Sequence, residues 1–295
     1  MDFYNLIDFE LYPFSFAEYV RFRGIKPDPL TTKGISFLKQ AYADYLEHGG
    51  FPELFQIGQN QKKIYIQTLL QSILYKDILQ RFTVKYAKAL GDIFNWSVEN
   101  YSREINCTGI AKMLGIRSVH TVQNYLDYLG QAYLALKLTK FSFQAGERLR
   151  SQKNFLVDMA FITHGTSELS GDNLGYQLEN VVYLELLRRR TQEDYEVYFY
   201  KKDYEVDFVL VRNRQVLRLI QVSYDIGTHK ARKRELNALL KGSVDLQCDE
   251  LLLITQSQSE NAEVDGKSIR IIPIVEWLLQ PYSHGRQRQR QATEW

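Results

Sequence analysis

The sequence predicts an α + α/β fold, and three observations along its 295 residues support this prediction. Residues 1–88 carry apolar side chains at helical spacing, interrupted by glycine and proline. Residues 89–148 contain two short helical segments, a glycine turn and a longer helix, and residues 149–282 alternate strand-like and helical segments. Residues 283–295 lack apolar periodicity, so we expect a disordered basic tail there. Several modules are expected because a single hydrophobic core stops growing as chains lengthen.

The composition is that of an ordinary globular protein, with 45% hydrophobic and 24% charged residues. The net charge of +2 does not indicate a polyanionic partner, so any basic surface must be local. The two cysteines, Cys107 and Cys248, lack a paired spacing, which disfavours a disulfide framework or a zinc site. The N-terminus is acidic where a signal peptide would be basic, and no stretch approaches the ~18 apolar residues of a membrane span. We therefore expect a cytoplasmic protein without a membrane partner.

The first section is expected to be helical and is rich in aromatic side chains. A helix should stop at Gly49 and Gly50, because glycine supplies a left-handed cap and the proline that follows at position 52 cannot continue a helix. The aromatic group near the start of the chain has two interpretations. It forms an ordinary core, or it leaves an exposed apolar patch that implies association with a partner or a second copy. This group comprises Tyr12, Phe14, Phe16, Tyr19 and Phe22.

The middle section has the spacing of a helix-turn-helix. Thr108 can cap a short second helix, Gly115 can make the turn, and Ser118 can cap a third helix. Short helices joined by a glycine turn to a capped longer helix are typical of this motif. The alternating apolar stretch at residues 134–143 is expected to add the β-wing of a winged helix. The predicted core stripe of the third helix comprises Val122, Tyr125, Leu126, Leu129 and Tyr133.

DNA binding is one function that this middle section predicts. Polar side chains that can bond base edges face outward from the third helix, although Arg117 is its only basic residue and Asp127 opposes phosphate. Cations in residues 137–153 outnumber Glu147, and phosphate contacts supply most non-specific affinity. The alternative is a winged helix that packs against a partner domain. The predicted DNA contacts are Thr121, Gln123, Asn124, Lys137, Lys140, Arg148 and Arg150, with Lys153 adding to the local charge.

The third section predicts a mixed sheet with helices packed on its faces, because helix, three strands, helix and further strands follow one another. A turn at Asp265 and Gly266 separates the last two apolar stretches. The expected helices span residues 174–190 and 229–240, and the expected strands span residues 195–202, 204–212, 215–226, 250–255 and 268–274.

Three oxygen-bearing side chains are the candidates for chemistry in this section. Glu179 points along an apolar helix face, Asp207 lies in an otherwise buried strand, and Gln221 lies on the next strand. If the two strands pair, these side chains converge beneath the helix. Carboxylate and amide oxygens suit magnesium and hence phosphodiester chemistry, with Glu179 and Asp207 as the metal ligands. The alternative is that a buried carboxylate such as Glu179 is satisfied by an ion pair or a hydrogen bond.

This pattern resembles the restriction-endonuclease-like superfamily, whose signature is an acidic helix residue, an aspartate, and then Glu/Gln-x-Lys on the next strand. Glu179, Asp207 and Gln221 match that signature, so the resemblance implies a catalytic role for them. Ser223, however, stands where the catalytic lysine is expected. Serine cannot stabilise developing negative charge as a cation does, so the site is expected to be degenerate. A migrated lysine would be nearest in sequence at Lys201, Lys202 or Lys230.

A larger stretch, residues 9–282, resembles the C-terminal part of predicted AAA-type ATPases of bacteria and archaea that carry a C-terminal domain of unknown function. Members of that family begin with a nucleotide-binding domain, and this chain starts after it. The string Gly266-Lys267-Ser268 lacks the first glycine of a phosphate-binding loop and lies in a hairpin turn, so ATP is not expected for this chain alone. The matching segments are LYPFSFAEYV, YLEHGGFPEL, YKDILQRF, IAKMLGIRSVHTVQNYLDYL, GYQLENVVYLELLRR, EVDFVL and LIQVSYDI.

We therefore expect a non-catalytic protein that binds DNA or a protein partner, such as an ATPase domain or a second copy of itself. Two other classes remain open. The first is a magnesium-dependent nuclease that uses Glu179, Asp207 and Gln221, with magnesium as the only cofactor under consideration. The second is a purely structural interaction module.

Overall fold

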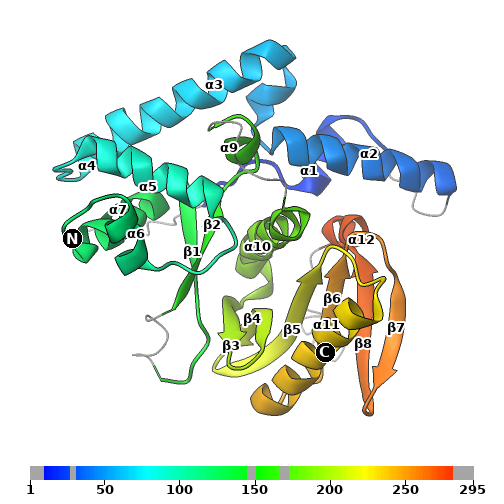
Figure 1. Cartoon of the computed structure of the whole chain (residues 1–295). Helices are drawn as coiled ribbons and strands as arrows, with labels where there is room; N and C mark the ends of the chain where they lie inside the picture. Colours follow the sequence, from blue (N-terminus) through cyan, green and yellow to red (C-terminus); the bar gives the residue numbers. More distant parts are fainter. Residues whose placement is uncertain (1–9, 27–30, 145–150, 166–172, 282–295) are drawn as a thin grey trace, which may run out of the picture.

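The computed structural model describes residues 10–26, 31–144, 151–165 and 173–281, and it shows a mixed α/β protein (Figure 1). The front of the chain forms helices and a small two-stranded sheet, and the back forms a six-stranded mixed sheet with helices. Helix α10 (Leu174–Glu193) lies between these two parts in Figure 1. The predicted disordered tail, residues 283–295, lies outside the described residues.

The first section is helical, as predicted. Ser15 and Glu18 form a reciprocal capping box that starts the first helix, because each side chain accepts a backbone N–H of the other residue. Of the aromatic group, Phe16 and Tyr19 are buried, while Phe22 is 47% exposed. The group therefore forms mainly a core. The elements are α1 (Phe16–Phe22), α2 (Thr32–His48), the 3-10 helix η1 (Pro52–Phe55), α3 (Gln59–Gln71), the π-helix η2 (Ser72–Ile78), α4 (Leu79–Arg81) and α5 (Ala87–Glu99).

The predicted helix stop at Gly49 is confirmed, and the structure adds a packing reason for it. Gly49 follows α2 with φ at +73°, and a Cβ at this position would lie 1.8 Å from Oδ1 of Asp158. The buried Asp158 carboxylate accepts hydrogen bonds from the backbone N–H groups of Gly50 and Ala160, both at 2.8 Å. The chain can approach Asp158 this closely only because position 49 has no side chain.

The middle section contains the predicted short helix, turn and longer helix, with different end residues. The elements are α6 (Cys107–Met113), α7 (Val119–Gln131), β1 (Ala135–Thr139), β2 (Gln152–Leu156) and α9 (Ala160–Thr163). Asn106, and not Thr108, caps α6, because its Oδ1 accepts from the N–H of Gly109 at 2.9 Å. Ser118 precedes α7 but makes no side-chain capping bond. Tyr133 does not join the core stripe, because α7 ends at Gln131 and Tyr133 has φ at +53° and is 39% exposed.

The wing-like stretch β1 pairs with β2 in antiparallel register, with Ala135 opposite Leu156 and Thr139 opposite Gln152. The domain boundary expected near residue 148 therefore falls between two paired strands. Asn180 of α10 extends this small sheet: its side-chain amide accepts from the N–H of Leu156 at 2.9 Å and donates to the carbonyl of Leu156 at 3.0 Å. The small sheet is thus bonded directly to the helix that covers the large sheet.

The predicted strands of the third section all form, and together they make one sheet in the order β3-β4-β5-β6-β8-β7. The pairs β5-β6 and β6-β8 are parallel, and the others are antiparallel. The elements are β3 (Glu196–Lys201), β4 (Glu205–Arg212), β5 (Gln215–Ser223), α11 (His229–Leu246), β6 (Leu251–Thr255), β7 (Glu260–Val264), β8 (Lys267–Pro273) and α12 (Ile274–Leu279). The edge strand β7 was not predicted, because Ala262 is its only buried residue.

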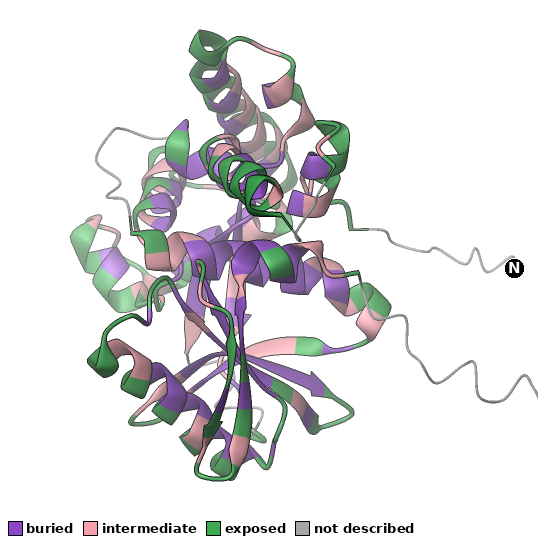
Figure 2. Ribbon diagram, turned by 90° about the vertical axis from the view of Figure 1, so that its right-hand side faces the viewer, coloured by how far each residue is buried: buried purple, intermediate pink, exposed green. Residues whose placement is uncertain are grey.

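Helices α10 and α11 cover opposite faces of this sheet. Phe208 and Ile220 belong to the core that includes α10, while Val209 and Leu219 belong to the core that includes α11. Figure 2 shows buried residues along the strands and along the helix that lies across the top of the sheet. Helix α10 is buried on nearly all sides, including its polar residues Glu179, Asn180, Glu185 and Arg189. Each of these polar groups therefore needs a partner inside the protein.

Candidate functional site

The candidate site lies where strands β4 and β5 separate. Their backbone pairing runs from Arg212 opposite Gln215 to Phe208 opposite Ile220 and then ends. Beyond that point side chains bridge the gap. Oδ2 of Asp207 accepts from the N–H of Val222 at 2.8 Å, and Oε1 of Gln221 accepts from the N–H of Asp207 at 3.4 Å. Asp207 and Gln221 thus satisfy backbone groups that the strands can no longer pair.

A buried lysine from the small sheet occupies the centre of the site. Nζ of Lys153 lies 2.8 Å from Oε1 of Glu179, 2.5 Å from Oε1 of Glu205 and 3.8 Å from Oδ1 of Asp207. The side chains of Lys153, Glu179 and Asp207 are 5%, 9% and 11% exposed, and that of Glu205 is 30% exposed. One ammonium group therefore joins β2, α10 and β4. The carboxylates of Glu179 and Asp207, from different elements, meet at this group.

The network continues from Gln221 to the far side of the sheet. Nε2 of Gln221 donates to Oε2 of Glu235 on α11 at 2.9 Å, and Glu235 in turn binds the guanidinium of Arg234. The Arg234 side chain is 75% exposed, so this arm ends at the surface. Ser223 donates to the carbonyl of Asp225 at 3.3 Å. Of the predicted residues, Glu179 and Asp207 meet at Lys153, whereas Gln221 contacts only the backbone N–H of Asp207 and donates to Glu235 on the other side of the sheet.

Three carboxylates surround one ammonium group at the site, and this imbalance together with burial shifts the pKa values of the acids. Burial raises the pKa of Asp207 well above its usual range, repulsion from Glu179 adds to the rise, and Lys153 opposes it. Burial also raises the pKa of Glu179, again against the pull of Lys153. Burial lowers the pKa of Lys153, but attraction to Glu179, Asp207 and Glu205 outweighs burial, so its pKa is raised. The lysine is therefore charged, and Asp207 is the acid most ready to hold a proton.

The cation at the site is not one of the three lysines considered from the sequence. Lys201 pairs with Glu104 and lies 3.5 Å from Oε2 of Glu205, at the rim. Lys202 bonds Asp245 at 2.7 Å on another surface, and Lys230 is exposed in the first turn of α11. Lys153 was missed because it was counted among the phosphate-binding charges. The signal available in the sequence was the apolar run at residues 155–157, which follows Lys153 and Asn154 and belongs largely to strand β2.

A magnesium ion does not fit this arrangement as it stands. Within the described ranges, no group of three or more His, Cys, Asp or Glu side chains is placed to hold a metal ion. Glu179 and Asp207, the predicted ligands, both face the ammonium of Lys153. Hard cations prefer several oxygen ligands around one point, and here a lysine takes that point.

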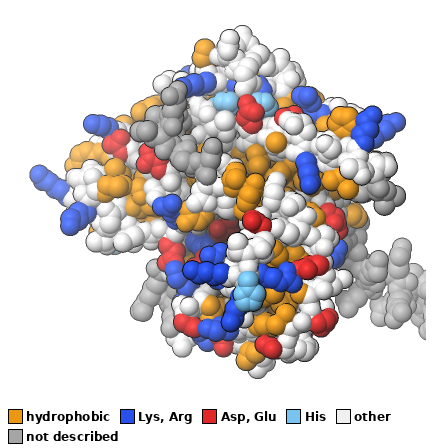
Figure 3. Space-filling model, turned by 45° about the vertical axis from the view of Figure 1, so that its right-hand side comes forward, with side chains coloured by type: hydrophobic (Ala, Val, Ile, Leu, Met, Phe, Trp, Pro, Cys, Tyr) orange, Lys and Arg blue, Asp and Glu red, His pale blue; other side chains and the backbone are white. Residues whose placement is uncertain are grey.

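The predicted DNA contacts are scattered. Gln123 and Asn124 are exposed on α7, and Thr121 is half-buried. Nζ of Lys137 bonds Oδ1 of Asp127 at 2.6 Å, and its side chain is only 18% exposed. Lys140 is half-buried beside β3, while Arg148 and Arg150 lie outside the described residues. Basic and acidic side chains both gather along the boundary between the helical part and the sheet part in Figure 3.

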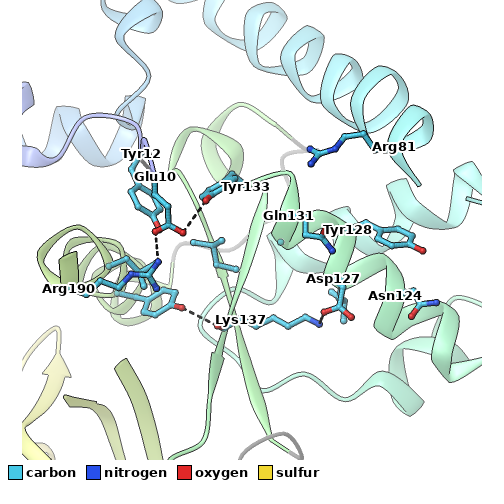
Figure 4. A pocket seen from close by; sticks show the side chains of 15 residues that line it. Glu10, Tyr12, Arg81, Asn124, Asp127, Tyr128, Gln131, Tyr133, Lys137 and Arg190 are labelled. Carbon is cyan, nitrogen blue, oxygen red and sulfur yellow. Dashed lines mark hydrogen bonds and ion pairs between the residues drawn. The ribbon is translucent and has the colours of Figure 1, made fainter. Parts of the chain in front are cut away.

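A pocket of about 690 Å³ lies beside α7 and takes up part of this predicted DNA-binding surface (Figure 4). Asn124, Asp127 and Lys137 line it, together with residues of α4, α10 and the segment before α1.

None of the helices in the described part of the chain is both long enough and apolar enough to cross a bilayer.

Two family models match the chain, and both describe domains of unknown function. The one named DUF8612 matches residues 39–170, and the one named DUF4143 matches residues 174–277. The first therefore covers most of the helical part with the small sheet, and the second covers α10 with the large sheet. The boundary between the two matches falls just before α10.

Two relatives are similar to this chain along most of its length. The uncharacterized protein MJ1544 of Methanocaldococcus jannaschii is 31% identical over 287 residues, which cover 92% of this chain and 63% of that protein. An uncharacterized protein of Haemophilus influenzae is 29% identical over 282 residues, which cover 93% of this chain and 65% of that protein. The chain thus spans less than two thirds of the length of these relatives. No solved structure matches it.

Proposed function

We propose that this chain is a non-catalytic binding protein whose partner is another protein, with an AAA-type ATPase domain as the first candidate. The observation that carries the proposal is the ammonium of Lys153 between Glu179, Glu205 and Asp207. The acids that resemble a nuclease site are thereby satisfied inside the chain. A buried ion pair of this kind fixes the relative placement of the elements that supply it, here β2, α10 and β4.

A protein partner is favoured over DNA by the state of the predicted phosphate contacts. Lys153 is buried among carboxylates, and Lys137 is bonded to Asp127, so neither is available to phosphate. Duplex binding depends on several such contacts, because each releases counterions from the DNA. The net charge of +2 provides no compensating field.

The ATPase partner rests on the resemblance of residues 9–282 to the C-terminal part of AAA-type ATPases. That resemblance implies a C-terminal domain of unknown function, and the match to DUF4143 over residues 174–277 supports this part of it. The greater length of both relatives is compatible with further domains in them. Light scattering of the chain mixed with AAA-type ATPase domains from the same organism tests the partner. We expect a 1:1 complex with at least one of them, and its absence with all of them removes this candidate.

DNA binding is tested by fluorescence anisotropy with a labelled duplex over a series of salt concentrations. We expect weak affinity that does not change when Lys137 and Lys140 are both replaced by alanine. Tight binding that falls steeply with salt, and falls less steeply in the double variant, would instead assign the chain to DNA-binding proteins.

A metal-dependent nuclease is the second candidate, and one observation favours it. Lys153 brings to Glu179 and Asp207 the cation that Ser223 does not supply. A plasmid-cleavage assay with magnesium or manganese separates the two proposals. We expect no cleavage above the background of the Asp207→Ala variant. Metal-dependent cleavage that this substitution abolishes would replace the binding proposal with the nuclease.

A further inference from the structure

The pocket beside α7 has an apolar floor and polar walls drawn from separate parts of the chain. Leu126, Leu136 and Leu187 supply the floor from α7, β1 and α10. Its volume of about 690 Å³ is within the range of ~300–1,000 Å³ that is typical of ligand sites. Figure 4 shows the side chains of Arg81 and of Arg190 at opposite sides of this space.

Most of the charge in the pocket is neutralised internally. Glu10 binds Arg190 and accepts hydrogen bonds from the hydroxyls of Tyr12 at 3.2 Å and Tyr133 at 3.1 Å. Burial acts to raise the pKa of Glu10. The hydrogen bond and the attraction to Arg190 outweigh burial, so the pKa of Glu10 is lowered and this carboxylate stays ionised. Lys137 and Asp127 form the second neutral pair. Both carboxylates of the lining are therefore paired with a cation, which leaves Arg81 as the remaining charged group.

Three groups in the walls are available to a ligand. The side-chain amides of Asn124 and Gln131 are exposed and make no hydrogen bond among the residues that the structure describes. Arg81 is held only loosely, because its partner Asp77 is 3.5 Å away and both side chains are more than 40% exposed. The Arg81 guanidinium lies over the ring of Phe82, which stacks on Tyr128 at 4.2 Å. The stacked rings of Phe82 and Tyr128 thus support the Arg81 guanidinium at the edge of the pocket.

We propose that the pocket beside α7 binds a short peptide segment of a partner protein, in which an apolar residue is followed by an acidic one. The apolar side chain lies on the leucine floor, and the carboxylate pairs with Arg81. The amides of Asn124 and Gln131, which carry both donors and acceptors, bond the neutral peptide backbone. Asn124, which the sequence predicted to contact DNA, thus contacts a protein instead.

A nucleic acid fits this pocket poorly. A phosphate group needs several cations or a run of free backbone N–H groups, and Arg81 is the one loosely held cation among the described lining residues. Arg190 and Lys137 are already paired with Glu10 and Asp127, so the described lining residues offer no second loosely held cation to another phosphate. A peptide with one carboxylate meets neither difficulty.

The test measures fluorescence polarisation of two panels of labelled, end-blocked octapeptides. The first panel carries leucine, phenylalanine or tryptophan followed by aspartate or glutamate, and the second carries lysine in place of the acid. We expect micromolar binding by members of the first panel only. Arg81→Ala should weaken it about tenfold, since a charge-assisted hydrogen bond is lost. Asn124→Trp should abolish it by filling the pocket.

Gln123→Trp is the matched control, because Gln123 is the adjacent exposed residue on α7 and does not line the pocket. Its binding should equal that of the unmodified chain. The inference is overturned if neither panel binds, if the lysine panel binds equally well, or if Asn124→Trp and Gln123→Trp behave alike. The inference rests on the proposed protein-binding function, but the two can be disproved by different results. Loss of peptide binding leaves the ATPase-domain titration untouched, whereas cleavage or salt-dependent DNA affinity would remove the proposed function itself.

Discussion

Replacing Lys153 by methionine is the sharpest test of the site. The substitution removes one buried ammonium and keeps most of the side-chain volume, so cavity effects stay small. It leaves Glu179 and Asp207 buried without their cation, and among the described residues it leaves Glu205 paired only with Lys201. The variant therefore isolates the electrostatic role of Lys153.

The expected loss of stability follows from the distances. At an effective dielectric of about 20, charges at the 2.8 Å of the Glu179 pair attract by about 6 kcal/mol and those at the 3.8 Å of the Asp207 pair by about 4 kcal/mol. Desolvation of the ammonium opposes this gain by several kcal/mol. Removing one partner of a buried pair usually costs about 3–5 kcal/mol, and we expect the loss at pH 8 to lie in that range.

The loss should depend on pH, with a defined sign. Burial raises the pKa of both Glu179 and Asp207, so the folded state holds protons that the unfolded state releases, and stability falls as pH rises above their ordinary pKa values. Without Lys153 both pKa values rise further and the fall becomes steeper. Near pH 4 the acids are largely protonated, so the variant should then be close to the unmodified chain or more stable than it.

Urea unfolding followed by circular dichroism at pH 4.5, 6 and 8 measures this difference. The double variant Lys153→Met with Glu179→Leu is the control, because removing both charges should recover part of the stability at pH 8. A loss that is the same at pH 4.5 and 8, or is smaller than about 1 kcal/mol at pH 8, would show that Lys153 is not the counter-charge of this cluster.

Three further substitutions test the packing that supports the site, each by urea unfolding. Gly49→Ala should lower the free energy of unfolding by at least about 3 kcal/mol, because its Cβ would lie 1.8 Å from Asp158. Gly24→Ala is the control: nothing lies within 4 Å of its Cβ, so it should cost only the left-handed backbone penalty of about 1–2 kcal/mol. Burial raises the pKa of Asp158 to about 6, so the free energy of unfolding should fall by on the order of 3 kcal/mol from pH 4 to 6. Asp158→Asn should flatten this slope, and an unchanged slope would show that Asp158 is not the group that titrates. Asn180→Leu should cost about 2–4 kcal/mol of stability by leaving the N–H and carbonyl of Leu156 unpaired. Asn237→Leu, at an exposed position, should change stability by no more than about 0.5 kcal/mol. Equal losses in the two variants would contradict the role of Asn180 in joining α10 to the small sheet.

Local patterns in the sequence were enough to predict much of the fold. The strands of the large sheet and helices α10 and α11 follow from apolar runs and from periods of two and 3.6 residues, which depend only on neighbouring residues. The stop at Gly49 and the turns at Gly115 and Gly266 follow from positive φ values that glycine adopts without strain. Strand β7 escaped prediction because it is an edge strand with little apolar content, whose pairing is decided by β8.

The sequence by itself also predicted that Glu179 and Asp207 would converge if strands β4 and β5 paired, and the structure places both carboxylates at one ammonium group. Only the tertiary structure decided which cation joins them. Lys153 lies 26 residues before Glu179, on a strand of a different sheet, and no periodicity links the two positions. The same holds for Lys137, whose charge is taken by Asp127 rather than offered to phosphate. Counting charges along a chain predicts local potential, but the availability of each charge depends on which groups the fold brings within about 4 Å of it.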